Sequence, residues 1–170
     1  MHTPGQMAGA LPPEAFGGDL IAEIKHLRAF AICLAGSVSD ADDLVRETLL
    51  SAWSRADQFP VGTKWRLGLL TILRNLFYSR FHQRPPEAAD RDSGYAGRLP
   101  VSKDQIGQVD LQDLGRALAT LPSHLREVLI LVGASGYTCE EAAAICQVEI
   151  ATIQSRFDSA RLELIMLLEL

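Results

Sequence analysis

Apolar residues recur at intervals of three and four positions along most of the chain, whereas the alternation typical of a β-strand is scarce. In the amino-terminal half this spacing predicts helices at about 19–35, 39–55 and 63–83. Their core-facing positions would be Leu20, Ile24, Leu27, Ala31, Leu44, Thr48, Leu49, Ala52, Leu69, Ile72, Leu73 and Leu76, with Trp53 beside those of the second helix. The pattern therefore predicts an all-α fold.

Residues that typically end or begin helices separate these three segments. Gly36 suits the end of the first helix because glycine adopts left-handed backbone without strain. Ser39 or Asp40 is a candidate N-cap for the second helix, because a short polar side chain accepts hydrogen bonds from first-turn amides. The break at Pro60–Gly62 precedes the third helix. The three helices are thus expected to form one small bundle.

A change of composition divides the chain beyond this bundle. Residues 85–109 are rich in Pro, Gly, Asp and Ser and have little periodic apolar content, which is typical of a flexible linker. Helical spacing resumes at 110–120, and Pro122, a residue suited to a first turn, opens a helix that runs to about Val132. The predicted organisation is a flexible tail at 1–18, a helical domain at 19–84, the linker at 85–109 and a second helical domain at 110–170.

The second domain has the spacing of a helix-turn-helix. Thr138 and Glu141 form the T-x-x-E pattern of a capping box before a short helix at Ala142–Ile145. A tight break at Gln147–Glu149 is followed by a longer helix from Ile150. Short helix, tight turn and longer helix are the order of a helix-turn-helix unit.

The start of the last helix is the part of such a unit that enters the major groove of DNA. The candidate DNA-contacting residues there are Thr152, Gln154, Ser155, Arg156 and Arg161. An ordinary helical hairpin remains an alternative. Acidic residues outnumber basic ones from Asp110 to Leu170, which weighs against strong DNA binding by this half alone.

A second candidate nucleic-acid site lies between Gln58 and Pro86, where an acidic chain of net charge -5 contains no acid at all. The segment combines the cations Lys64, Arg66, Arg74, Arg80 and Arg84 with the aromatic residues Trp65, Phe77, Tyr78 and Phe81. Cations follow phosphates and rings stack on exposed bases, so this mixture is typical of a site for unpaired nucleic acid. The alternative is a solvated helix face over an aromatic core, with Trp65 as a core anchor.

Other classes of protein have little support. The tail at 1–18 lacks the charged start and apolar run of a signal peptide, and no apolar run reaches the ~20 residues that span a bilayer. The widely spaced Cys33, Cys139 and Cys146 indicate a reducing cytoplasm and no zinc site. The chain contains no phosphate-cradling glycine loop and no hydrolase motif, so we expect no enzyme activity, no cofactor and no metal ion.

Four further segments stand out in the order Asp40–Trp53 (DADDLVRETLLSAW), Thr71–Asn75 (TILRN), Leu121–Pro122 and Ile130–Gly136 (ILVGASG). In this order and spacing they resemble an RNA polymerase sigma factor of the extracytoplasmic-function type. Ile130–Gly136, with the Glu-Glu-Ala-Ala that follows, is most similar to the general-stress-response branch of alphaproteobacteria. The resemblance covers about residues 19–164.

The resemblance implies a region-two domain that binds core RNA polymerase and opens promoter DNA at the -10 element, and a region-four domain that reads the -35 element. The polymerase-binding helix would contain Asp42, Asp43, Arg46 and Glu47. The -10 site would contain Arg74 and Asn75 with the neighbouring Lys64, Trp65, Arg66, Tyr78 and Arg80. A small anti-sigma protein that clamps the two domains is the further implied partner, since mobile helical domains expose apolar grooves that a partner helix can fill.

The chain departs from the family pattern in its DNA-reading parts. Gln154, Asp158 and Ser159 stand where the family has lysine, asparagine and arginine, which removes positive charge near the phosphates. Gln147 stands where glycine is common, and the family's tryptophan has moved to Trp65. Two functions follow from this: a sigma factor for general-stress promoters, or a sigma-like module that sequesters an anti-sigma factor or modulates polymerase without efficient DNA reading.

Overall fold

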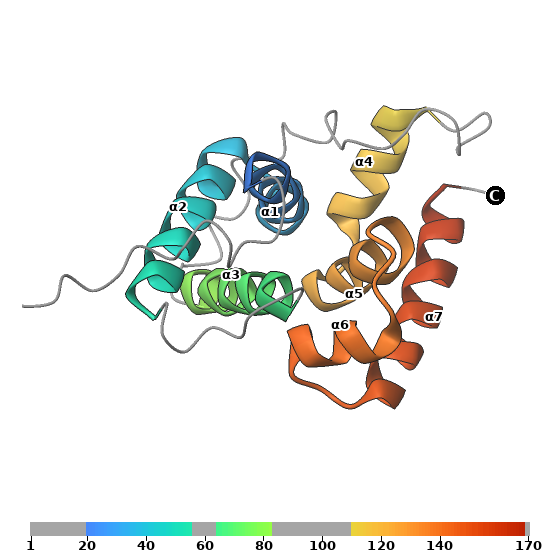
Figure 1. The fold of residues 1–170 in the computed structure, drawn as a ribbon. Coiled ribbons are helices and arrows are strands. Elements are labelled where there is room, and N and C mark those ends of the chain that lie inside the picture. The colour runs from blue at the N-terminus through green and yellow to red at the C-terminus, as the bar shows by residue number, and fades with distance from the viewer. Residues whose placement is uncertain (1–19, 56–63, 83–109, 169–170) are drawn as a thin grey trace, which may run out of the picture.

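The computed structural model describes residues 20–55, 64–82 and 110–168, and this part of the chain consists of helices joined by short turns (Figure 1). The predicted tail at 1–18 and the predicted linker at 85–109 lie outside the described residues. The elements are α1 (Leu20–Ala35), α2 (Val38–Ser54), α3 (Lys64–His82), α4 (Leu111–Thr120), α5 (Ser123–Val128), the π-helical segment η5 (Leu129–Ala134), α6 (Cys139–Cys146) and α7 (Ile150–Leu167). The all-α prediction is confirmed.

Helices α1, α2 and α3 pack against one another as a bundle. Leu27, Ala31, Leu44 and Leu73 are buried between them, as the spacing predicts, and burial of one such leucine contributes about 1.5–3 kcal/mol. The prediction for Trp53 is wrong: its side chain is 54% exposed on the outer side of α2. The inward stripe of α2 is already filled by leucine, valine, alanine and Thr48, whose hydroxyl donates to the Leu44 carbonyl and so needs no water.

The turn between α1 and α2 is tighter than predicted. Gly36 has a left-handed backbone, with φ 71°, and its amide donates to the Ile32 carbonyl at 2.8 Å, which ends α1. Ser37 is then extended and its hydroxyl accepts from the amide of Asp40, so Ser37 is the N-cap of α2. The predicted N-cap at Ser39 or Asp40 is therefore wrong, because both residues already lie inside the helix.

The carboxyl-terminal helices begin at polar residues or proline. Asp110 caps α4 by accepting from the amide of Gln112, and Pro122 is the N-cap residue of α5, one position before the predicted first turn. Helix α5 continues without interruption into η5, so the predicted helix is present, but its second half is wound more loosely. The capping box of Thr138 and Glu141 is confirmed, with both hydrogen bonds present.

Helices α6 and α7 form the predicted helix-turn-helix. The turn contains Gln147 in left-handed backbone, with φ 56° and ψ 44°, a conformation that costs about 1–2 kcal/mol for a residue other than glycine. Ala142, Ala143 and Ile153 are buried where the two helices meet, and Val148 packs beside them. Small side chains on α6 permit this close approach.

The two sets of helices are in contact. Helix α3 packs against α6 and α1 packs against α5, so the buried residues of both halves form one continuous apolar cluster. Figure 1 shows α1–α3 on one side, α4–α7 on the other, and α7 at the far edge from α2. None of the helices in the described ranges has the length and apolar character needed to cross a membrane.

Candidate functional site

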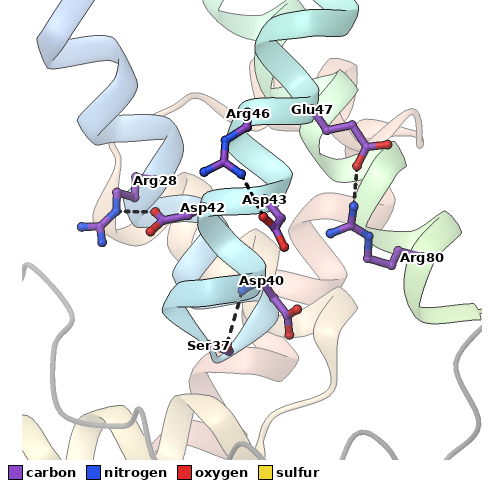
Figure 2. A network of polar contacts seen from close by, with 8 residues as sticks. All are labelled: Arg28, Ser37, Asp40, Asp42, Asp43, Arg46, Glu47 and Arg80. Atoms are coloured by element: carbon purple, nitrogen blue, oxygen red, sulfur yellow. Dashed lines mark hydrogen bonds and ion pairs between the residues drawn. The ribbon is translucent and has the colours of Figure 1, made fainter.

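The charged face of α2 is the first candidate surface, and we define it by Asp42, Asp43, Arg46 and Glu47 (Figure 2). Asp42 accepts from Arg28 of α1 at 2.7 Å, and Asp43 accepts from Arg46 one turn later at 3.3 Å. Glu47 points toward α3, where it pairs with Arg80. Exposed pairs of this kind contribute only ~0–1 kcal/mol each, so their groups can be rearranged by a partner at little cost.

Two large apolar side chains lie beside this charged face. Leu50 is 66% exposed and Trp53 is 54% exposed, and their spacing places them on the same side of α2 as Arg46. An exposed tryptophan with charged neighbours is typical of the centre of a protein–protein interface. The sequence reasoning missed both residues, although the signal was present: α2 has more apolar positions than one buried stripe can hold.

The acid-free segment supplies α3, and its arginines meet carboxylates from other helices. Arg66 pairs with Glu23 of α1 at 2.5 Å, and Arg80 pairs with Glu47 of α2. The third, Arg74, pairs with Glu127 of α5. The side chains of Lys64 and Arg84 lie outside the described residues. The positive charge that the sequence concentrates on one helix is thus largely matched by packing in the folded chain.

The aromatic residues of α3 are mostly part of the core. Trp65 is only 3% exposed, which agrees with the core-anchor alternative, and the Arg66 guanidinium lies 5.8 Å from its ring centre. Phe77 is buried, with its ring centre 5.1 Å from that of Tyr78. Asn75, in contrast, is exposed. Of the predicted -10 residues whose side chains the structure describes, Asn75 is therefore the one that the fold leaves most open to a ligand.

Arg74 and Glu127 form the most buried ion pair in the part of the chain that the structure describes. The guanidinium donates twice to the carboxylate, with Nε–Oε2 at 2.9 Å and Nη2–Oε1 at 3.1 Å. The Glu127 side chain is fully buried, and the Arg74 guanidinium lies 4.6 Å from the centre of the Tyr78 ring. Burial, and secondly the negative charge of Glu127, raise the pKa of the Tyr78 hydroxyl. The carboxylate end of this cluster is therefore shielded from solvent, whereas Arg74 and Tyr78 are partly exposed.

The candidate DNA-contacting residues of α7 divide between faces of the helix. Thr152, Ser155 and Arg156 are spaced three and four positions apart and share a face, whereas Gln154 lies away from them and Arg161 lies over the ring of Phe157 at 5.9 Å. Gln154, Ser155 and Arg161 are exposed. The structure therefore presents a helix-turn-helix with an accessible second helix that carries few cations. Within the described ranges, no group of three or more His, Cys, Asp or Glu residues is placed to hold a metal ion.

Two family models match the chain, one in each half. Residues 20–74 match "Sigma2 domain of PhyR", and residues 111–164 match "Sigma-70, region 4". Among curated proteins, the chain is similar to the ECF RNA polymerase sigma factor EcfG of Rhodopseudomonas palustris, with 46% identity over 150 residues, which covers 88% of this chain and 83% of the relative.

Solved structures give the same result. The chain is similar to the sigma factor RpoE in its complex with the anti-sigma factor NepR from Bartonella quintana, with a TM-score of 0.72 and 42% identity over 91% of this chain and 97% of that one. It is also similar to the NMR structure of the PhyRSL–NepR complex from Sphingomonas sp. Fr1, with a TM-score of 0.60 and 25% identity over 85% of this chain and 83% of that one.

Proposed function

The chain belongs to the extracytoplasmic-function family of RNA polymerase sigma factors, and from that premise we propose that it directs RNA polymerase to general-stress promoters under the control of a small anti-sigma protein. The observation that carries this function is the alignment with EcfG, which covers 88% of the chain. A sigma factor acts through polymerase, so the chain regulates transcription and itself catalyses no reaction. Its place of action is the cytoplasm, where polymerase meets promoter DNA.

We assign polymerase binding to the charged face of α2 together with Leu50 and Trp53. The support is physical: apolar side chains exposed beside exchangeable ion pairs give an interface both buried area and orientation. Helix α2 also lies away from α4–α7 in Figure 1, so polymerase can reach this face while the two halves are in contact. The orientation of α2 on polymerase would be set by the charged side chains of Asp42, Asp43, Arg46 and Glu47.

We assign promoter opening to α3. Unstacking a base step costs a few kcal/mol, and a protein lowers that cost by holding the separated strand. Asn75 is already exposed, and Arg74 and Arg80 become available for phosphates when their carboxylate partners leave. Trp65 would support the helix from inside, since it is buried.

We assign recognition of the -35 element to the face of α7 that contains Thr152, Ser155 and Arg156, with Gln154 and Arg161 beside it. The helix-turn-helix geometry supports this assignment. The low positive charge of α7 predicts that this contact is weak and depends on the polymerase-bound first half to position it.

We propose that the anti-sigma protein contacts the exposed apolar end of α7. Leu162, Ile165 and Met166 are exposed there, beside a hollow of about 300 Å³ lined by Thr120, Glu163, Met166 and Leu167. An amphipathic partner helix would bury these residues. The similar RpoE chain, of which this chain covers 97%, was solved in complex with the anti-sigma factor NepR.

The test is transcription from a general-stress promoter with purified core polymerase, with and without the chain, and then with an anti-sigma protein of the NepR type. We expect a transcript that requires the chain and disappears when the anti-sigma protein is added at equal concentration. The second candidate function, a sigma-like interaction module, is favoured by the loss of cations from α7. It predicts binding to core polymerase or to the anti-sigma protein with no transcript.

A further inference from the structure

The side of α7 that faces away from the core carries a single charge, and that charge is negative. Ile153 and Ala160 are buried against the other helices, and the opposite side of α7 is exposed. We define this outer face by the exposed residues Ala151, Gln154, Ser155, Asp158, Ser159 and Leu162, which recur at intervals of three and four positions. Asp158 is the one charged residue among the six, so the outer face presents a carboxylate to any DNA that lies against it.

Within the described ranges, the Asp158 carboxylate forms no hydrogen bond or ion pair with another residue. Its candidate partner along the helix is Arg161, because oppositely charged residues three positions apart can pair. The Arg161 guanidinium instead lies over the Phe157 ring, 5.9 Å from the ring centre. That ring packs in turn against η5, where a Cβ atom on Gly133 would lie 3.5 Å from Cε2 of Phe157. Asp158 is therefore an exposed carboxylate with its capacity to accept hydrogen bonds unused.

The position of Asp158 along α7 suits a contact with a base. Helix α7 begins at Ile150, so Asp158 lies in its first half, one turn beyond Gln154 and three positions beyond Ser155. One helical turn rises about 5.4 Å and successive bases of a strand lie roughly 3.4 Å apart, so side chains on adjacent turns reach neighbouring base pairs. The neutral Gln154 and Ser155 both donate and accept hydrogen bonds and so tolerate several bases, whereas an ionised carboxylate only accepts.

The four bases differ in what they offer a carboxylate in the major groove. Cytosine presents the donor group N4–H2, whereas guanine presents two acceptors and thymine presents an acceptor and a methyl group. Adenine presents a donor beside an acceptor, so it is intermediate. A carboxylate that reaches the base edges therefore favours cytosine and disfavours guanine and thymine. The same negative charge repels the phosphates, which weakens binding to every sequence alike.

We propose that Asp158 determines the sequence specificity of this chain at one position of the -35 element, where its carboxylate accepts a hydrogen bond from the N4 amino group of a cytosine. The order of preference at that position is cytosine, then adenine, then guanine or thymine. The inference rests on the proposed role of α7 in -35 recognition and adds a base preference to it. It also gives the low positive charge of α7 a consequence besides weak binding, because the residue that repels phosphates selects one base.

The test measures base preference and needs neither polymerase nor transcription. The full chain is mixed at low salt with a pool of DNA duplexes whose -35 positions are randomised, and the bound duplexes are separated and sequenced. We expect one position at which cytosine is favoured over guanine at least about fivefold, a ratio typical of one base contact. Asp158→Ala should lose this preference. Asp158→Asn should move it to adenine, because an amide side chain binds N6 and N7 of that base.

Asp113→Asn is the matched control, because it removes the same charge from α4, where Asp113 forms an exposed ion pair with Arg116. It should leave every base preference unchanged. If Asp158→Asn raises the affinity for all duplexes equally and alters no preference, the carboxylate only repels phosphates and the proposal is overturned. Failure of the original chain to enrich any duplex would overturn it as well. A chain that selects cytosine but supports no transcript would refute the proposed function alone.

Discussion

Arg80 of α3 and Glu47 of α2 form an ion pair that joins the candidate DNA-binding helix to the candidate polymerase-binding helix (Figure 2). Both side chains keep partial contact with water, with Arg80 the less exposed of the two. A partner that takes Glu47 therefore releases a cation on α3. Polymerase binding and strand binding would be coupled through this one pair, in a molecule where each arginine of α3 that the structure describes has a carboxylate neighbour.

Replacing Arg80 with glutamine separates its structural role from its role on DNA. The pair is partly exposed, so we expect the free energy of unfolding to change by no more than ~1 kcal/mol. Promoter opening should fall severalfold, because a phosphate contact is lost. Urea unfolding and permanganate footprinting of the opened promoter measure the two effects. Full opening with Arg80→Gln would remove this residue from the -10 site.

Trp53→Ala should weaken binding to core polymerase at least tenfold while leaving the fold intact. The side chain is more than half exposed, so its removal should change the free energy of unfolding of the free chain by about 0.5 kcal/mol or less. Loss of a central aromatic residue from an interface, in contrast, costs about 2 kcal/mol or more of binding free energy. Fluorescence anisotropy with labelled core polymerase measures the affinity.

Trp65→Ala is the matched control for that experiment. Trp65 is 3% exposed, and truncation of a buried tryptophan costs about 3–5 kcal/mol, so this variant should lower the thermal midpoint strongly. If the two variants are equally destabilised, Trp53 packs in the core and the interface assignment is wrong.

These two tryptophans show what the sequence could and could not predict. Helix spacing, the end of α1 at Gly36 and the capping box of Thr138 and Glu141 depend on nearby residues, so local patterns were enough. Which tryptophan is buried depends on how three helices share one core, and local spacing carries no such information. The pairing of Arg74 with Glu127 depends on the docking of two halves, which follows from neither half alone.

The charges of the acid-free segment show the same limit of prediction from local sequence. Lys64, Arg66, Arg74 and Arg80 were correctly placed on one helix. The prediction of an open basic stripe did not include Glu23 and Glu47, which come from other helices. Net charge along a segment predicts what the segment attracts. In the folded chain, carboxylates of the protein itself pair with the arginines that the structure describes on this segment.

Gln147→Gly should stabilise the helix-turn-helix. Gln147 is exposed and has φ 56°, a conformation that costs ~1–2 kcal/mol for a residue with a Cβ atom. Glycine removes that cost but gives the unfolded chain about 0.4–1 kcal/mol of extra conformational freedom, so the net gain should be about 0.5–1 kcal/mol. Thermal unfolding measures it, with Gln147→Ala as the control, which keeps the strain. Equal midpoints for the two variants would show that the turn is not strained.

Stability should fall in alkaline solution, in part through Cys146. Burial, and secondly the negative charge of Glu127, raise the pKa of this thiol from 9.0 to about 12. The unfolded chain ionises the thiol above pH 9 while the folded chain holds it neutral, so the contribution is complete below pH 9 and is lost as the pH rises toward 12. The slope should be at most ~1.4 kcal/mol per pH unit.

Urea unfolding between pH 7 and pH 11, with a reductant present, measures this dependence. Cys146→Ala should be less stable at pH 7, because it leaves a small void, but should lose less stability between pH 9 and pH 11 than the original chain. Parallel curves for the two proteins would show that the thiol does not carry the alkaline loss.

Restoring cations to α7 tests whether its weak charge limits DNA reading. Gln154 and Ser159 are exposed, so Gln154→Lys and Ser159→Arg can be made without disturbing the core. Each new phosphate contact should steepen the dependence of log K on log salt by ~0.9, and the pair should raise affinity for a -35 duplex at least tenfold at low salt. Gln112→Lys, which adds a cation to the exposed side of α4, is the control. An equal gain from Gln112→Lys would mean that total charge, and not the α7 face, sets the affinity, and the assignment of -35 recognition to α7 would fall.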